Sequence, residues 1–160
     1  MDPLDTMFRH HAWATLRLID HCAALPDALQ AEVPGTRGTI GTTLVHLVAA
    51  DQRYLARMDG EEAAIRVSER EEAPPLADVR AAMEAQAERW SALVRRAPDL
   101  VVTIPARGET PETPNAEDLL FLQAIHHGND HRTHVCTILG ALEMEVPDLS
   151  GWQYWATERR

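Results

Sequence analysis

The sequence contains no lysine, so all fifteen basic residues are arginines, and they are scattered among 25 acidic residues. The formal net charge at pH 7 is −10. A protein that binds the nucleic-acid backbone needs clustered cations to offset the phosphate charge. We therefore expect that nucleic acid is not a partner of this chain.

Long apolar runs are also missing, since no stretch approaches the roughly 20 apolar residues that a membrane-spanning helix needs. The N-terminus lacks the cationic and apolar regions of a signal peptide. We expect no membrane association and a cytoplasmic location. The two cysteines, Cys22 and Cys136, have no Cys-x2-Cys spacing, and in a reducing compartment they are predicted to be core residues without a disulfide.

Several catalytic motifs are absent as well. The sequence has neither a glycine-rich phosphate loop nor a nucleophile elbow, and it lacks the helix-borne Glu-x2-His pairs of di-iron carboxylate bundles. The residue after His127 is Gly128, where a zinc metalloprotease motif requires a glutamate general base. Metalloprotease chemistry is therefore disfavoured.

What the sequence does contain predicts an all-α fold in a single domain, 1–160. Hydrophobic residues make up 45% of the chain, glycine is scarce, and apolar residues recur every three to four positions. Asn115 is the predicted N-cap of the last long helix and Gly140 its stop. The predicted helices span residues 4–25, 39–58, 76–96 and 116–139, with a brief β-like run at 100–104.

The connection 59–75 is much longer than a tight helix hairpin needs. Its length predicts a four-helix bundle with a long crossover, so that the second and third helices run in the same direction. The chain ends in a short aromatic segment containing Trp152, Tyr154 and Trp155. Such a cluster usually packs into a core or a subunit contact. The second interpretation is that these aromatic residues form a wall of a substrate site.

Four of the eight histidines fall between residues 126 and 134. On a helix, His127 and His131 lie one turn apart on the same side, and His134 falls nearly in line with His127. The same side carries Leu120, Ala124 and Ile138, so these histidines should face the interior. A buried imidazole needs a hydrogen-bond partner, a charge or a metal, because unpaired ring nitrogens cost about 1–3 kcal/mol.

His46 is the only ionisable residue in the apolar centre of the second helix, and it would complete a metal site as a third ligand. Three neutral imidazoles suit Zn, Ni, Fe or Co and leave coordination positions open for water or substrate. The alternative is a set of core histidines that bind backbone or carboxylate groups. His11 lies on the apolar side of the first helix, where it could line the same cavity or, more simply, be a hydrogen-bonded core residue.

Three segments of the sequence carry a resemblance to a known family: residues 10–18 (HHAWATLRL), residues 39–47 (TIGTTLVHL) and residues 127–132 (HGNDHR). They are similar, in that order, to the aromatic-Asn-x-Trp-Ala-Asn helix, the second-helix histidine segment and the His-x3-His-Arg signature of the DinB-like (DNA-damage-inducible) superfamily of metalloenzymes. The sequence resembles that superfamily over nearly its whole length. The family usually continues with Gly-Gln, where this chain has Thr133 and His134, and it often has Asn at the position of His11.

The resemblance implies a divalent metal held by His46, His127 and His131 in a bundle that is usually dimeric. It also implies a reaction of the low-molecular-weight-thiol type, since relatives include transferases and a maleylpyruvate isomerase that use mycothiol, bacillithiol or glutathione.

From these features we derive two functional hypotheses. The first is a metal-dependent thiol transferase or isomerase that acts on a small molecule, in which His134 or His11 moves a proton and the region of Trp152 and Tyr154 encloses the electrophile. The second is a non-catalytic dimeric bundle that binds a small molecule or a protein and in which the histidines are structural.

Overall fold

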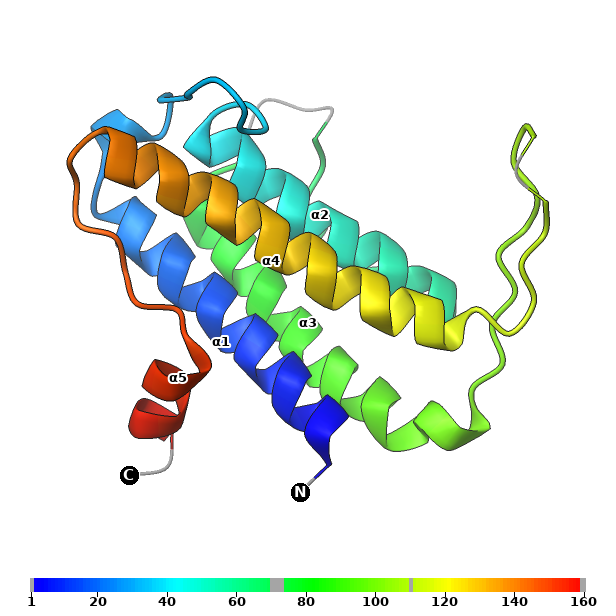
Figure 1. The fold of residues 1–160 in the computed structure, drawn as a ribbon. Coiled ribbons are helices and arrows are strands. Elements are labelled where there is room, and N and C mark those ends of the chain that lie inside the picture. Colours follow the sequence, from blue (N-terminus) through cyan, green and yellow to red (C-terminus); the bar gives the residue numbers. More distant parts are fainter. Residues whose placement is uncertain (1, 70–73, 110, 159–160) are drawn as a thin grey trace.

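Four long helices and one short helix dominate the computed structural model, which describes residues 2–69, 74–109 and 111–158. The short helix α5 lies beside α1, near the end of the chain (Figure 1). The prediction of an all-α bundle is confirmed. The helices are α1 (Pro3–Ala23), α2 (Ile40–Asp59), α3 (Leu76–Arg96), α4 (Glu117–Ala141) and α5 (Gly151–Glu158), with 3-10 turns at Pro26–Ala28 and Ala97–Asp99.

Local sequence signals define the ends of the first two helices. The Asp2 side chain accepts a hydrogen bond from the Leu4 amide and precedes Pro3 at the first helical position, an arrangement that favours helix initiation. Thr39 caps α2 by accepting from the Thr42 amide. Gly60 ends α2 in the left-handed conformation at φ 74°, which glycine adopts without steric cost.

The predicted ends of the last long helix are wrong by a residue or two. Asn115 has a positive φ of 51° and does not cap α4, whose N-cap is Ala116. Gly140 lies inside α4, and the turn after the helix is made by Glu143 at φ 56°. In the described part of 100–104, the only β pairing is an isolated bridge between Ile104 and Thr113.

The connection after α2 runs back along the bundle, as the crossover prediction requires. The Gln52 side chain in the middle of α2 accepts a hydrogen bond from the Val67 amide and donates one to the Ile65 carbonyl. Glu69 lies further back, beside His46. As a result, α2 and α3 run in the same direction (Figure 1). Residues 70–73 of this connection lie outside the described residues.

Two groups of buried side chains fill the bundle, in which α1 packs on α3 and α4, and α2 packs on α3 and α4. One group centres on aromatic residues from three helices, with the Phe8 ring 4.4 Å from that of Trp90 and 5.5 Å from that of Phe121. The core is thus closed by these rings and not by the C-terminal aromatics, since α5 contributes no buried residue.

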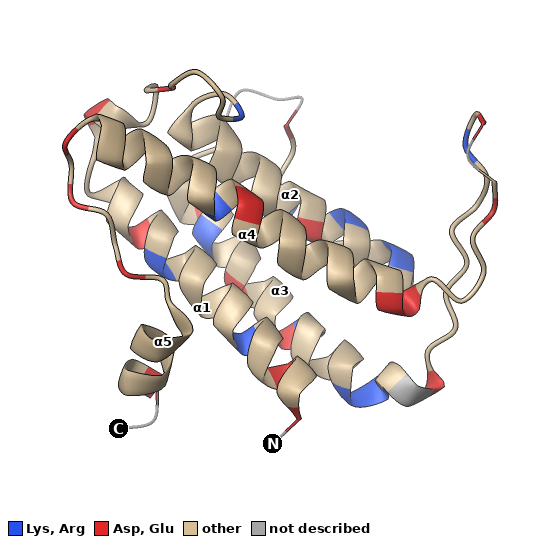
Figure 2. Ribbon diagram, viewed as in Figure 1, with Lys and Arg blue, Asp and Glu red and all other residues tan. Residues whose placement is uncertain are grey.

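Arginines are distributed over α1, α2, α3 and α4 and are interspersed with acidic residues (Figure 2). Within the residues that the structure describes, none of the helices has the length and hydropathy needed to cross a bilayer.

Candidate metal centre

Three histidines from two helices converge between α2 and α4. One ring nitrogen from each of His46, His127 and His131 lies within 4.8 Å of the other two. His127 and His131 come from successive turns of α4, and their ring centroids are 4.3 Å apart. His46 reaches them from α2, with its ring centroid 4.7 Å from that of His131 and 5.0 Å from that of His127.

Packing explains why these side chains meet. The apolar neighbours predicted to share the histidine side of α4, Leu120, Ala124 and Ile138, are all buried in the structure. His131 is buried with them, whereas His46 and His127 are half-buried at the edge of the helix contact. The cluster is therefore enclosed at His131 and partly open to solvent at His46 and His127.

The environment keeps these imidazoles uncharged near neutral pH. Burial, followed by the nearby His46, lowers the pKa of His127 from 6.5 to about 4. Burial, followed by the charges of His127 and His46, lowers the pKa of His131 to about 4 as well. Burial also lowers the pKa of His46, although its hydrogen bond to Glu69 opposes that shift. Neutral rings keep lone pairs available for coordination.

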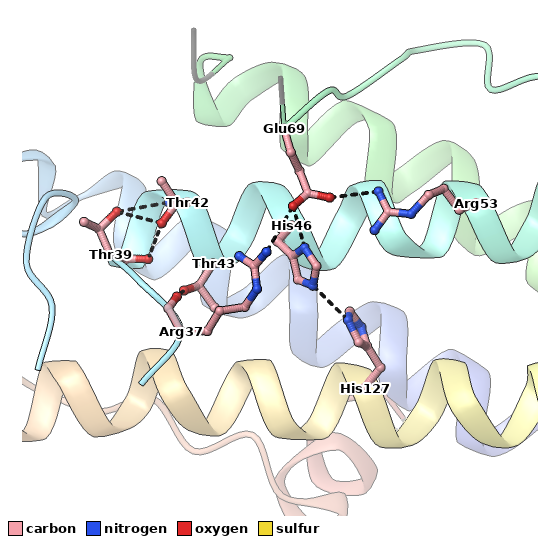
Figure 3. Close-up of polar contacts among 8 residues, drawn as sticks. All are labelled: Arg37, Thr39, Thr42, Thr43, His46, Arg53, Glu69 and His127. Atoms are coloured by element: carbon pink, nitrogen blue, oxygen red, sulfur yellow. Dashed lines mark hydrogen bonds and ion pairs between the residues drawn. The ribbon is translucent and has the colours of Figure 1, made fainter. Parts of the chain in front are cut away.

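Glu69 is a functional neighbour that sequence reasoning missed. Its Oε2 accepts a hydrogen bond of 2.6 Å from His46 Nδ1, and Arg37 and Arg53 hold the same carboxylate from either side (Figure 3). Burial alone would raise the pKa of Glu69, but the hydrogen bonds from His46 and Arg53 outweigh it and lower the pKa. The sequence signal was weak, because Glu69 is one of several acidic residues in a connection without periodicity.

The arrangement fits a divalent metal. The Nε2 atoms of His46 and His127 lie 3.0 Å apart. Two nitrogens bound at about 2.0–2.1 Å to one tetrahedral ion would be separated by about 3.4 Å, so a shift of a few tenths of an ångström suffices. The Nδ1 atoms of His127 and His131 are buried without a hydrogen-bond partner among the described residues. On His127 this Nδ1 lies on the other side of the ring from the Nε2 that faces His46, so it indicates an outer hydrogen-bond partner such as a water molecule and not the ion itself.

Comparison with known proteins places this arrangement in a family. The model of the DinB family matches residues 1–159. The chain belongs to the DinB family. No curated protein matched the chain. Family membership and the converging imidazoles agree that the histidine cluster of this DinB-family chain could hold a metal.

His134 lies next to the three histidines but outside the set that converges. Its ring centroid is 5.4 Å from that of His131, and its Nδ1 is buried without a described partner. It is half-buried, one turn beyond His131 on α4. The structure therefore puts an additional imidazole beside the cluster.

His11 belongs to a different group of polar residues in the core, to which each long helix contributes. His11 Nε2 donates to Asp51 Oδ2 at 2.7 Å, and Trp90 Nε1 donates to the same oxygen at 3.3 Å. A guanidinium can only donate, so His11 Nδ1 accepts the hydrogen bond from Arg132 at 3.2 Å. Both ring nitrogens are occupied and the side chain is 1% exposed, which favours the core interpretation of His11 over a role in proton transfer.

Gly128 allows this group to lie against α4. A Cβ added at Gly128 would lie 2.3 Å from His11 Cε1 and 2.6 Å from His11 Nδ1. Packing therefore explains why this position holds a glycine and not the glutamate of a metalloprotease motif.

The aromatic residues of α5 lie apart from the three histidines. Tyr154 packs against His10 and Trp13 of α1, with ring centroids 5.6 and 5.4 Å away, and Trp152 is 87% exposed. Of the two roles predicted for this segment, closing the core is wrong, because no residue of α5 is buried, and a subunit contact stays a prediction. Tyr154 and Trp155 do line a pocket with His11 and Arg132, but the three clustered histidines are not among its lining residues, so α5 does not form a wall of the candidate metal centre.

His10 and His21 have a role that the sequence did not reveal. Each Nε2 lies 2.8 Å from a backbone carbonyl of the segment after α4, that of Leu149 for His10 and that of Glu145 for His21. These two histidines thus fasten the C-terminal segment along α1.

Proposed function

We propose that this DinB-family protein is a divalent-metal-dependent enzyme of the low-molecular-weight-thiol transferase or isomerase type, with His46, His127 and His131 as the metal ligands. The convergence of three neutral imidazoles within 4.8 Å is the observation that carries the proposal. All-histidine ligation of this kind suits Zn, Ni or Fe and leaves coordination positions for a substrate. When bound, such an ion stabilises a thiolate or lowers the pKa of a coordinated water.

The chain's own residues supply the remaining functions in this proposal. The half-buried rings of His46 and His127 form the open side at which a small-molecule thiol and its electrophile would enter. His134, with its unpartnered Nδ1 next to His131, is the proton carrier. Arg37 and Arg53 border the site and are 41% and 52% exposed. A homodimeric assembly and a cytoplasmic location are part of the same proposal.

The test is turnover that requires both components. Protein purified without a histidine tag and loaded with Zn, Ni or Fe would be assayed with glutathione, mycothiol and bacillithiol against a panel of electrophiles. We expect thiol consumption that disappears on chelation and in His127→Ala, and that falls about 10²–10⁴-fold in His134→Ala if that residue transfers the proton. Metal-dependent stabilisation without turnover for any pair would contradict the enzymatic proposal.

The alternative proposal is a non-catalytic bundle whose histidines are structural. One contact favours it: His46 and His127 form a hydrogen bond of 3.0 Å with each other, so they can satisfy two ring nitrogens without an ion. This alternative predicts that metal removal affects thermal unfolding alone and that no thiol is turned over with or without metal.

A further inference from the structure

The crossover between α2 and α3 brings one carboxylate to the candidate metal centre. Glu69 Oε2 accepts the 2.6 Å hydrogen bond from His46 Nδ1, on the side of the ring opposite His127 (Figure 3). We propose that Glu69 is a positioning residue, which selects the tautomer of His46 and fixes its ring so that the Nε2 lone pair points at the metal position. This inference rests on the proposed metal site.

The tautomer follows from the chemistry of the two groups. An ionised carboxylate only accepts hydrogen bonds, so the proton in the contact belongs to His46 Nδ1. A neutral imidazole has one such proton, and Nε2 is then left with its lone pair. That Nε2 lies 3.0 Å from His127 Nε2, which must donate in the absence of an ion. Glu69 thus leaves His46 in the one neutral form that can coordinate through Nε2.

Glu69 is itself held in place by both of its oxygens. Oε1 accepts from Arg53 at 2.8 Å, and Arg37 reaches Oε2 at 3.2 Å. The backbone just before Glu69 is fixed to α2 by Gln52, which binds Ile65 and Val67. Because the carboxylate and the backbone before it are both held in place, the His46 ring contacts a preorganised acceptor. Outer partners of this kind typically change metal affinity 10–100-fold when they are removed.

The competing explanation is an ordinary surface ion pair that ties the crossover to α2. Exposed pairs contribute little to stability, and Glu69 is 29% exposed. Such a pair would restrain the chain but would not decide which nitrogen of His46 carries the proton. The tautomer of His46 therefore separates the two explanations.

The variant is Glu69→Gln, which keeps the size of the side chain but can either accept from His46 Nδ1 or donate to it. Its matched control is Glu62→Gln, which removes one charge from an exposed glutamate of the same segment. In metal-free protein, ¹⁵N-detected imidazole spectra should show His46 with its proton on Nδ1 in wild type and in the control. We expect a substantial Nε2-protonated fraction in Glu69→Gln.

The second readout is affinity for Zn²⁺ and Co²⁺, measured by competition with a chromophoric chelator. We expect Glu69→Gln to bind 10–100-fold more weakly and Glu62→Gln to stay within about twofold of wild type. An unchanged His46 tautomer, or equal weakening in both variants, would overturn the positioning role. If wild type binds no metal, the proposed function fails, whereas the tautomer measurement still decides what Glu69 does to His46.

Discussion

At the scale of single residues, Gly128 is the position where the addition of one methyl group has the clearest consequence. Alanine favours a helix over glycine by about 1 kcal/mol. At Gly128 the new Cβ would lie 2.3 Å from His11 Cε1, and His11 is held by both of its ring nitrogens. Because that ring cannot move away without breaking its hydrogen bonds, we expect Gly128→Ala to lower the free energy of unfolding by about 1–3 kcal/mol, as measured by urea denaturation.

Gly140 offers the matched control on the same helix. A Cβ there would meet only Val146 Cγ2, at an ordinary contact distance of 3.8 Å. Gly140→Ala should therefore leave stability unchanged or raise it by up to about 1 kcal/mol. Equal effects of the two substitutions would mean that the close approach at Gly128 is not a constraint.

The buried thiol of Cys22 should be unreactive. Burial, with a smaller contribution from Cys136, raises its pKa to about 12, and the side chain is 1% exposed. At pH 8 the thiolate fraction would be about one part in 10⁴, and the thiolate is the reactive form. In a colorimetric thiol assay at pH 8, Cys22 should react only after denaturation. Rapid reaction of both Cys22 and Cys136 in the native protein would contradict this placement.

At the scale of elements, the four long helices are joined by the buried group around Asp51. His11 of α1 and Trp90 of α3 donate to Asp51 of α2, and Arg132 of α4 donates to His11. Asp51 is the acidic partner that balances the buried Arg132 charge through the intervening imidazole. Asp51→Asn should therefore destabilise the protein by about 3–5 kcal/mol, which chemical denaturation would measure.

The comparison for Asp51 is Asp20→Asn, which removes an exposed ion pair with Arg80 on the outside of α1 and α3. Exposed pairs have little effect on stability. A similar loss in the two variants would show that the buried group does not hold the bundle together.

The sequence predicted the long elements better than their ends. Apolar periodicity located all four long helices, because burial of one face determines where a helix forms. The end of α4 was predicted at Gly140, but Glu143 is the residue that adopts the positive φ. The position of this turn depends on the segment that follows it, which His21 of α1 contacts at the Glu145 carbonyl. The helix α5 was missed because its few aromatics show no apolar face to be buried.

At the scale of the whole molecule, the predicted crossover and the cluster of three histidines meet at one contact, between Glu69 and His46. The length of the connection indicated that α2 and α3 run in parallel, and the same path carries Glu69 back to His46. Helical spacing predicted that His127 and His131 share a side, whereas the meeting with His46 depended on helix packing and was supported by the family resemblance. Glu69 could not be predicted, because its position is set by the tertiary path of an irregular segment.

The measurement that tests the central claim most directly is metal binding by untagged wild-type protein and by His46→Ala, using elemental analysis and competition titration. We predict one divalent ion per chain in wild type, and its loss or a weakening of at least 100-fold in His46→Ala. Bound metal should also raise the midpoint of thermal unfolding, by mass action on the folded state. Wild-type protein that binds no ion, or His46→Ala that binds it as tightly as wild type, would contradict the account.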